Sequence, residues 1–141
     1  MVQKIIIMMK LTFKNVLLYI FLKYLIFYVF LMFKNGNYAL IRLNDLKTPG
    51  DWYYYLWIFL SLPVINAILF SAPIYYSFKF KSLFFFALLI GAVFVAEYFL
   101  YTYLASEADL MNGVYSGIIS ILLFILFFYR HIVSMLNQQA T

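Results

Sequence analysis

The sequence has no cysteine and a single histidine, His131, in 141 residues. Disulfides, cysteine-ligated zinc, iron–sulfur clusters and cysteine nucleophiles are therefore excluded, and a histidine-rich metal site cannot form. Charged residues are also scarce, at 11% of the chain, and only five of them are Asp or Glu. Because these acids are dispersed along the sequence, we expect no metal site, no cofactor and no catalytic carboxylate pair.

Hydrophobic residues, in contrast, make up 67% of the chain and aromatic residues 23%. A soluble domain is typically about 45–50% apolar and about 25% charged. The excess excludes an ordinary soluble domain and a disordered tail. The net charge of +5 comes from scattered basic residues rather than from a basic stripe, so no nucleic-acid partner is expected. The composition predicts an integral membrane protein that has the lipid bilayer as its first partner.

Four apolar runs are long enough to cross a bilayer, which takes about 20 residues in a helix. They lie at approximately 15–33, 52–78, 82–105 and 114–135. None of them alternates between apolar and polar residues, so barrel strands are not expected. The sequence predicts an all-α integral membrane fold over residues 1–141, in which a single domain forms a four-transmembrane-helix antiparallel bundle.

The breaks between these runs contain residues that end or start helices. Gly36 follows the first run and is expected to stop its helix. Residues 48–51, with Pro and Gly in the middle, predict a turn, and Asp51 is expected to cap the second helix. The segment 79–82 is so short that the second and third runs are expected to form a tight hairpin.

The basic residues predict which way the bundle faces, because cytoplasmic loops of membrane proteins are enriched in Lys and Arg. With the N-terminus inside, six basic residues lie inside and three outside. Both termini are therefore expected in the cytoplasm. The bias to Phe, Ile, Leu, Tyr, Lys and Asn is typical of an AT-rich genome, either bacterial or organellar, and the expected location is a bacterial cytoplasmic (inner) membrane. The start codon is left open between Met1, Met8 and Met9.

Three polar residues fall inside the predicted spans and are candidates for function: Lys23, Asn66 and Glu97. An ionisable group at the centre of a span costs about 2.5–3.5 kcal/mol on insertion scales. Lys23 and Glu97 either form a buried pair or proton-responsive site, or serve structure only. In the structural alternative Lys23 extends to the inner face and tyrosine hydroxyls bind Glu97. Asn66 is expected at a depth similar to that of Lys23, within contact of it.

Pro63 and Pro73 both fall in the second run and are hinge candidates. Proline removes a backbone donor and usually bends a helix, so the second helix is predicted to be kinked. The kink either forms a gate or only improves packing.

Two pairs of small residues at four-residue spacing are helix-packing candidates: Ala87 with Gly91, and Gly113 with Gly117. Such spacing lets helix backbones approach closely, within one chain or between two copies.

Trp52 and Trp57 at the start of the second run, and Arg130 at the end of the fourth, are expected to anchor the protein at the two membrane interfaces.

No catalytic or phosphate-binding motif is present in the sequence, and its polar segments are too short for a catalytic domain. We therefore expect a non-catalytic multi-pass membrane protein, not an enzyme. It would act as a subunit or self-assembling component of a membrane complex, such as the membrane component of a bacterial defence or immunity cassette. Its partners would be further copies or other protein subunits. The alternative is an oligomeric pore, ion channel or small transporter with Glu97 and Lys23 in its path.

Overall fold

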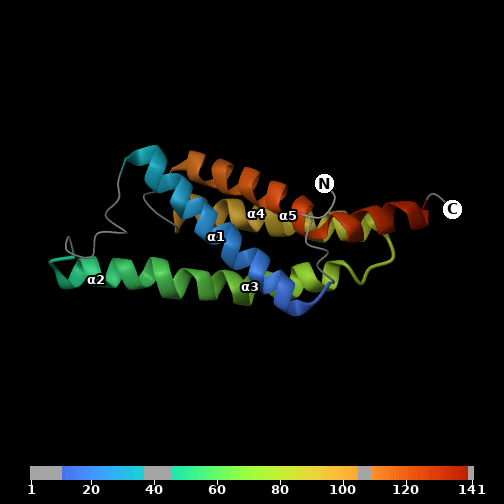
Figure 1. Cartoon of the computed structure of the whole chain (residues 1–141), viewed down its shortest axis with the longest axis horizontal. Helices are drawn as coiled ribbons and strands as arrows, with labels where there is room; N and C mark the ends of the chain where they lie inside the picture. The colour runs from blue at the N-terminus through green and yellow to red at the C-terminus, as the bar shows by residue number, and fades with distance from the viewer. Residues whose placement is uncertain (1–10, 37–45, 105–108, 140–141) are drawn as a thin grey trace, which may run out of the picture.

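The computed structural model describes residues 11–36, 46–104 and 109–139. Within these residues the regular structure is entirely helical, with no strand. Four helical stretches are long and apolar enough to cross a membrane (Figure 1). The predicted all-helical, multi-pass membrane fold is thus confirmed at this level. Met1, Met8 and Met9 lie outside the described residues.

The helices agree closely with the predicted spans. The first, third and fourth spans are single α-helices, whereas the second span also contains a π-helix. In chain order the elements are α1 Phe13–Asn35, α2 Pro49–Leu56, η3 Trp57–Ser61, α3 Leu62–Ser77, α4 Leu83–Tyr103 and α5 Leu110–Gln139.

Side chains at the helix ends explain why α1 begins and ends where it does. The Thr12 hydroxyl accepts a hydrogen bond from the backbone N–H of Asn15 at 3.2 Å. Gly36 ends the helix in the left-handed conformation, with φ of 60°, which only glycine adopts without steric penalty. The predicted stop at Gly36 is confirmed.

The start of α2 differs from the prediction. Thr48, not Asp51, is the N-cap: its hydroxyl accepts from the Asp51 N–H at 3.2 Å. The Asp51 carboxylate in turn accepts from the Thr48 N–H at 2.8 Å, which completes a capping box. The prediction was wrong because Pro49 can serve as the first helical residue, where its missing N–H is not needed and its fixed φ suits the helix.

The π-helix η3 lies immediately before Pro63 and explains how the chain accommodates this proline. The Leu62 N–H bonds to the Trp57 carbonyl, five residues back. In that register the Ile58 carbonyl would need an N–H from Pro63, which has none. The Tyr24 hydroxyl of α1 donates to the Ile58 carbonyl instead. The carbonyl freed by Pro63 is therefore satisfied by a neighbouring helix, as burial in a membrane protein requires.

We expect Tyr24→Phe to destabilise the bundle by about 1–3 kcal/mol, because it leaves a buried carbonyl without a donor. The loss should shrink when Pro63→Ala is added, since alanine restores an N–H to the helix. Tyr53→Phe is the matched control, because the Tyr53 side chain is 70% exposed. Unfolding by a denaturing detergent measures the stability of four variants: Tyr24→Phe, Pro63→Ala, the double variant and Tyr53→Phe. An equal loss with and without Pro63→Ala would contradict this account of η3.

Each helix packs against two others. Close backbone contacts join α1 to α3 and α5, and they join α4 to the same two helices. Within the described chain no such contact joins α1 to α4, so these two helices lie diagonally across the bundle. Figure 1 shows the four spans side by side in one elongated body, with the end of α5 extending past the connection between α3 and α4.

Aromatic rings fill much of the interior. The Tyr19 ring of α1 lies 5.6–5.9 Å from the rings of Phe124, Phe127 and Phe128 on α5. Many large apolar side chains on all four spans point outward instead and are exposed. In water such a surface would aggregate, whereas in a bilayer it faces lipid.

Candidate functional site

Lys23 of α1 and Glu97 of α4 form an ion pair in the centre of the bundle. Their side chains are 0% and 2% exposed. Of the two expectations for these residues, the structure shows the buried pair. Lys23 does not extend to the end of its helix, and a carboxylate partner compensates its charge inside the protein.

The pair joins helices that are not neighbours. Because α1 and α4 are diagonal, two long side chains have to meet across the interior between α3 and α5. The pair therefore links the positions of all four spans. It joins α1 to α4 directly, and α3 and α5 cannot move toward each other without displacing it.

Ser120 of α5 completes the hydrogen bonding of the carboxylate. Its hydroxyl donates to Glu97 Oε2 at 2.9 Å. The Tyr19 hydroxyl of α1 donates to the Ser120 backbone carbonyl at 3.1 Å. Each oxygen of Glu97 thus has a donor, one from α1 and one from α5, which is the condition under which a buried charge is tolerated.

Aromatic faces enclose the ammonium group. Lys23 Nζ lies 5.1 Å from the centre of the Tyr19 ring and 5.8 Å from the centre of the Phe70 ring on α3. A ring face carries partial negative charge and attracts a cation within about 6 Å. With Phe70, all four spans contribute a side chain to the site.

Asn66 of α3 is fully buried near this site but is not part of its hydrogen-bond network. Its amide nitrogen donates to the Leu62 carbonyl one turn earlier, at 2.8 Å. Its Oδ1 atom has no hydrogen-bond partner among the described residues. The predicted contact with Lys23 is therefore not a hydrogen bond.

Three further hydroxyls are buried without a partner in the part of the chain that is described. They belong to Tyr101 and Thr102 of α4 and to Ser116 of α5. In the structural alternative a tyrosine hydroxyl, such as that of Tyr101, would bind Glu97, but Lys23 and Ser120 bind the carboxylate instead.

The hinge candidates differ in their surroundings. Pro63 is buried and follows the π-helix, whereas Pro73 is half-buried inside α3, which continues through it. Only at Pro63 does the helix change its hydrogen-bond register.

The small-residue candidates also differ. A Cβ atom added to Gly113 would lie 2.3 Å from Thr102 Oγ1 and 2.7 Å from the Tyr98 ring, so α4 leaves no room for a larger residue at this position of α5. At Gly91 and Gly117 an added Cβ would meet nothing within 4 Å, and Ala87 is exposed. Within one chain only Gly113 lies at a close approach; contacts with a second chain remain a prediction for the other three.

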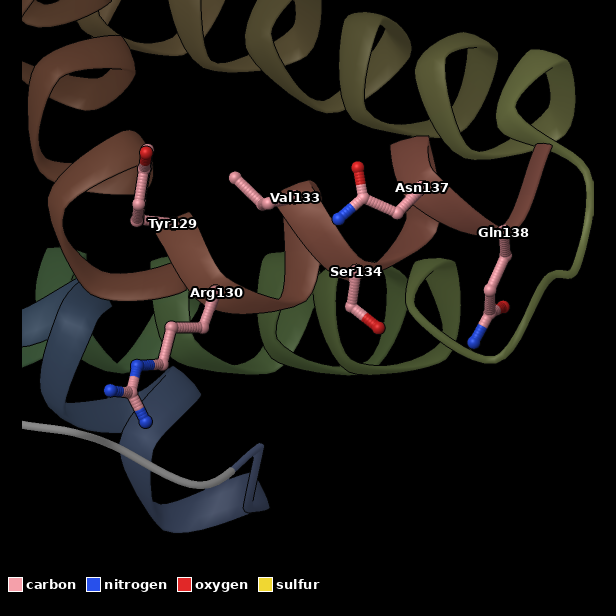
Figure 2. A pocket seen from close by; sticks show the side chains of 6 residues that line it. All are labelled: Tyr129, Arg130, Val133, Ser134, Asn137 and Gln138. Carbon is pink, nitrogen blue, oxygen red and sulfur yellow. The ribbon is translucent and has the colours of Figure 1, made fainter. Parts of the chain in front are cut away.

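The interface candidates lie on the surface. Trp52 is 47% exposed, Trp57 is half-buried and Arg130 is exposed. Figure 2 shows Arg130 in an open groove along the last turns of α5. The residues that line this groove come from α5 alone: Tyr129, Arg130, Val133, Ser134, Asn137 and Gln138.

Lys23 and Glu97 were predicted from the sequence, whereas Tyr19, Phe70 and Ser120, which complete the site, were not. The sequence contains one signal for Ser120: it lies four residues after Ser116 on one face of an apolar helix. Aromatic residues are too frequent in this chain for Tyr19 or Phe70 to stand out.

In the described residues no three His, Cys, Asp or Glu side chains lie close enough together to hold a metal ion. The only ion pair in that part of the chain is Lys23–Glu97, and it is enclosed by protein. No known protein family, curated protein or solved structure matches the chain.

Proposed function

We propose that this protein is a non-catalytic, multi-pass component of a membrane complex, formed with further copies of itself or with other subunits. The membrane component of a bacterial defence or immunity cassette, in the cytoplasmic membrane, is one such role. The proposal includes an antiparallel bundle with a kinked second helix and both termini in the cytoplasm.

The observation that carries this proposal is the enclosure of the Lys23–Glu97 pair inside a single chain. A carboxylate that acts on a substrate needs access to it. Here Glu97 is held by Lys23 and Ser120 and is 1% exposed, so its contacts serve to hold helices together. What the chain leaves free for interaction is its outer surface.

Contacts between helix ends support the antiparallel arrangement. The Phe13 ring at the start of α1 lies 5.8 Å from the Tyr75 ring at the end of α3. Thr102 at the end of α4 lies against Gly113 at the start of α5. The change of register before Pro63 supports the kink, because π-turns and prolines are the usual causes of one.

The end of α5 supports a partner on one side of the membrane. A helix of 30 residues is about 45 Å long, more than the roughly 30 Å of hydrocarbon it has to cross. Its last turns carry the open groove that contains the polar side chains of Arg130, Ser134 and Asn137. A soluble segment of a partner would find hydrogen-bonding groups there and lipid-like surface elsewhere.

The pore or transporter remains the second candidate, and the buried hydroxyls of α4 and α5 favour it. The structure restricts its form. Because Lys23 and Glu97 face the interior of one bundle, a pore formed between copies would not pass them. A path past both residues would have to run through a single chain.

The deciding experiment is the native mass of the gently solubilised protein, combined with photo-crosslinking. We expect a species heavier than the 16.7 kDa chain, containing further copies or another protein. A photoreactive residue at Ile118 or Leu126, which are 53% and 63% exposed, should form crosslinks to that partner. The same residue at Phe128, which is 1% exposed, is the control and should not. A lone chain that conducts ions in liposomes would instead establish the second candidate.

A further inference from the structure

One stripe of α5 changes character halfway along the helix. Five buried residues recur at every fourth position: Asn112, Ser116, Ser120, Phe124 and Phe128. Each of them lies on nearly the same face as the residue one turn before it, so the stripe winds gradually around the helix. The first three are polar and the last two are aromatic. The change occurs next to Ser120, the residue that binds Glu97.

The polar half of this stripe faces further polar groups on α4. Tyr101 follows Glu97 by one helical turn and Thr102 is adjacent to it. The hydroxyls of Tyr101, Thr102 and Ser116 have no hydrogen-bond partner in the described protein, and these side chains are at most 1% exposed. A hydroxyl buried without a partner is costly, and ordered water is the usual remedy where several such groups lie together.

Two contacts order these groups along the bundle. Thr102 lies against Gly113, and Ser120 bonds to Glu97. Tyr101 and Ser116 fall between these two points on their helices. The residues that carry the three hydroxyls therefore lie between Glu97 and the end of the bundle where α4 stops and α5 starts, with the Tyr101 ring against Phe27 of α1.

The other half of the bundle is closed by rings. Phe78, which follows α3, lies 5.1 Å from Phe86, 5.7 Å from Phe124 and 5.0 Å from Phe128, between ring centres. The serine buried at that end, Ser77, donates to the Ile74 carbonyl at 2.7 Å and needs no water. His131 Nδ1 is also buried at that end, beside the Phe78 ring and without a partner among the described residues, but Phe124 and Phe128 stand on α5 between it and Ser120. The rings therefore separate the ion pair from polar groups on that side, whereas the three hydroxyls lie on the other.

We propose that water enters the bundle at the end where α4 stops and α5 starts and delivers protons to Glu97 from that end only. The ligand is water or hydronium, and the site is a one-ended path rather than a pore. This inference goes beyond the function proposed above and does not depend on which proteins assemble with the chain.

The step is a proton transfer, without oxidation or reduction. A proton from bulk water passes along the ordered water and binds a carboxylate oxygen of Glu97, which becomes a neutral acid. The positive charge of Lys23 then has no counter-ion, so the pair separates or Lys23 releases its own proton to the water path. The groups that face Glu97 are Lys23 and Tyr19 from α1, Ser120 from α5, Tyr101 from its own helix and, through Lys23, the ring of Phe70 from α3. Of these only Lys23 and the two tyrosines titrate.

The absence of cysteine from the sequence makes the path directly testable. Ser116→Cys places a thiol in the polar half, and Ser77→Cys places one in the aromatic half as a matched control. Both serines are buried, at 1% and 0% exposure. A thiol reacts only as the thiolate, which needs water. The probe is methanethiosulfonate ethylammonium, a small cationic thiol reagent, added to the protein in liposomes.

We expect Ser116→Cys to react at least about tenfold faster than Ser77→Cys, because a dry thiol stays protonated and inert. Equal rates at the two positions would overturn the one-ended path. Failure of both to react would overturn it as well, since water would then not reach Ser116.

A second measurement leaves the site unmutated. The chain has only two glutamates, Glu97 and Glu107, so Glu107→Gln with isotope-labelled glutamate leaves Glu97 as the only labelled carboxyl group. We expect its carboxylate band in the infrared spectrum to be replaced by the acid band on acidification, with a shift in D₂O. A carboxylate band that is insensitive to pH and D₂O would show that protons do not reach Glu97. The infrared result is independent of the native mass that tests the proposed function, so either proposal can fail without the other.

Discussion

Lys23→Met should destabilise the folded bundle by about 3–5 kcal/mol, the usual effect of removing one member of a buried ion pair. The substitution keeps much of the side-chain volume but leaves Glu97 charged in an interior where it is 1% exposed. The measurement is the free energy of unfolding in mixed detergent micelles, followed by the loss of helical or tertiary signal. Lys14→Met on the same helix is the matched control, because Lys14 is exposed and should show little change.

Membrane insertion should respond in the opposite direction. A lysine at the centre of a span opposes insertion by about 2.5–3.5 kcal/mol, so removing it favours the isolated first span. The folded bundle nevertheless loses stability. Once the four helices have packed, Glu97 is buried without the positive charge of Lys23, and this penalty does not exist while the first span stands alone in the membrane. Efficient insertion together with poor resistance to detergent would separate the two effects. Reduced insertion of Lys23→Met would contradict this explanation.

The double variant Lys23→Met/Glu97→Met tests whether the pair or the single charge matters. Buried ion pairs replaced by apolar residues of similar size are often neutral or stabilising by about 1–4 kcal/mol. We therefore expect the double variant to recover most or all of the stability lost in Lys23→Met. The Ser120 hydroxyl, having lost its acceptor, can bond to a carbonyl of its own helix. If the double variant is as unstable as the single one, the site contributes more than charge compensation.

Gly113→Ala is expected to destabilise the bundle by about 1–3 kcal/mol through overpacking. The new methyl group would lie 2.3 Å from Thr102 Oγ1 and 2.7 Å from the Tyr98 ring, well inside van der Waals contact. Either the side chains shift or α4 and α5 move apart. Thermal unfolding of the protein in nanodiscs would measure the change.

Gly117→Ala provides the control, because it lies one turn along the same helix. A Cβ there meets nothing within 4 Å. Alanine also favours a helix by up to about 1 kcal/mol relative to glycine, so this variant should be neutral or slightly stabilised. If Gly117→Ala destabilised the protein as much as Gly113→Ala does, then Gly117 would have to pack against another chain. That result would support the small-residue face as an interface between copies.

Much of the fold follows from the sequence alone. Apolar length and the scarcity of charge predict four membrane helices, because hydropathy adds up residue by residue along a span and the bilayer requires every backbone group to be bonded internally. Gly36 predicts the end of α1 for an equally local reason. Lys23 and Glu97 stand out for the same reason, since an ionisable residue in an apolar run is conspicuous without any structure.

The start of α2 is a feature that neighbouring residues in the sequence do not determine uniquely. Thr48 and Asp51 are both good capping residues, and the sequence does not say which of them caps and which pairs back as the third helical residue. The π-helix before Pro63 could not be predicted either, because its free carbonyl is satisfied by Tyr24, a residue far away in the sequence.

Only the tertiary structure decided that Lys23 and Glu97 meet across the diagonal of the bundle, that Ser120 joins them, and that Gly113 rather than Gly117 lies at a close helix contact. The physical reason is that the spans are apolar on all sides. Lipid is as apolar as a leucine side chain, so hydrophobicity does not select which faces of the helices meet. Packing and a few polar contacts select them, and both depend on residues that come together only when all four helices are in place.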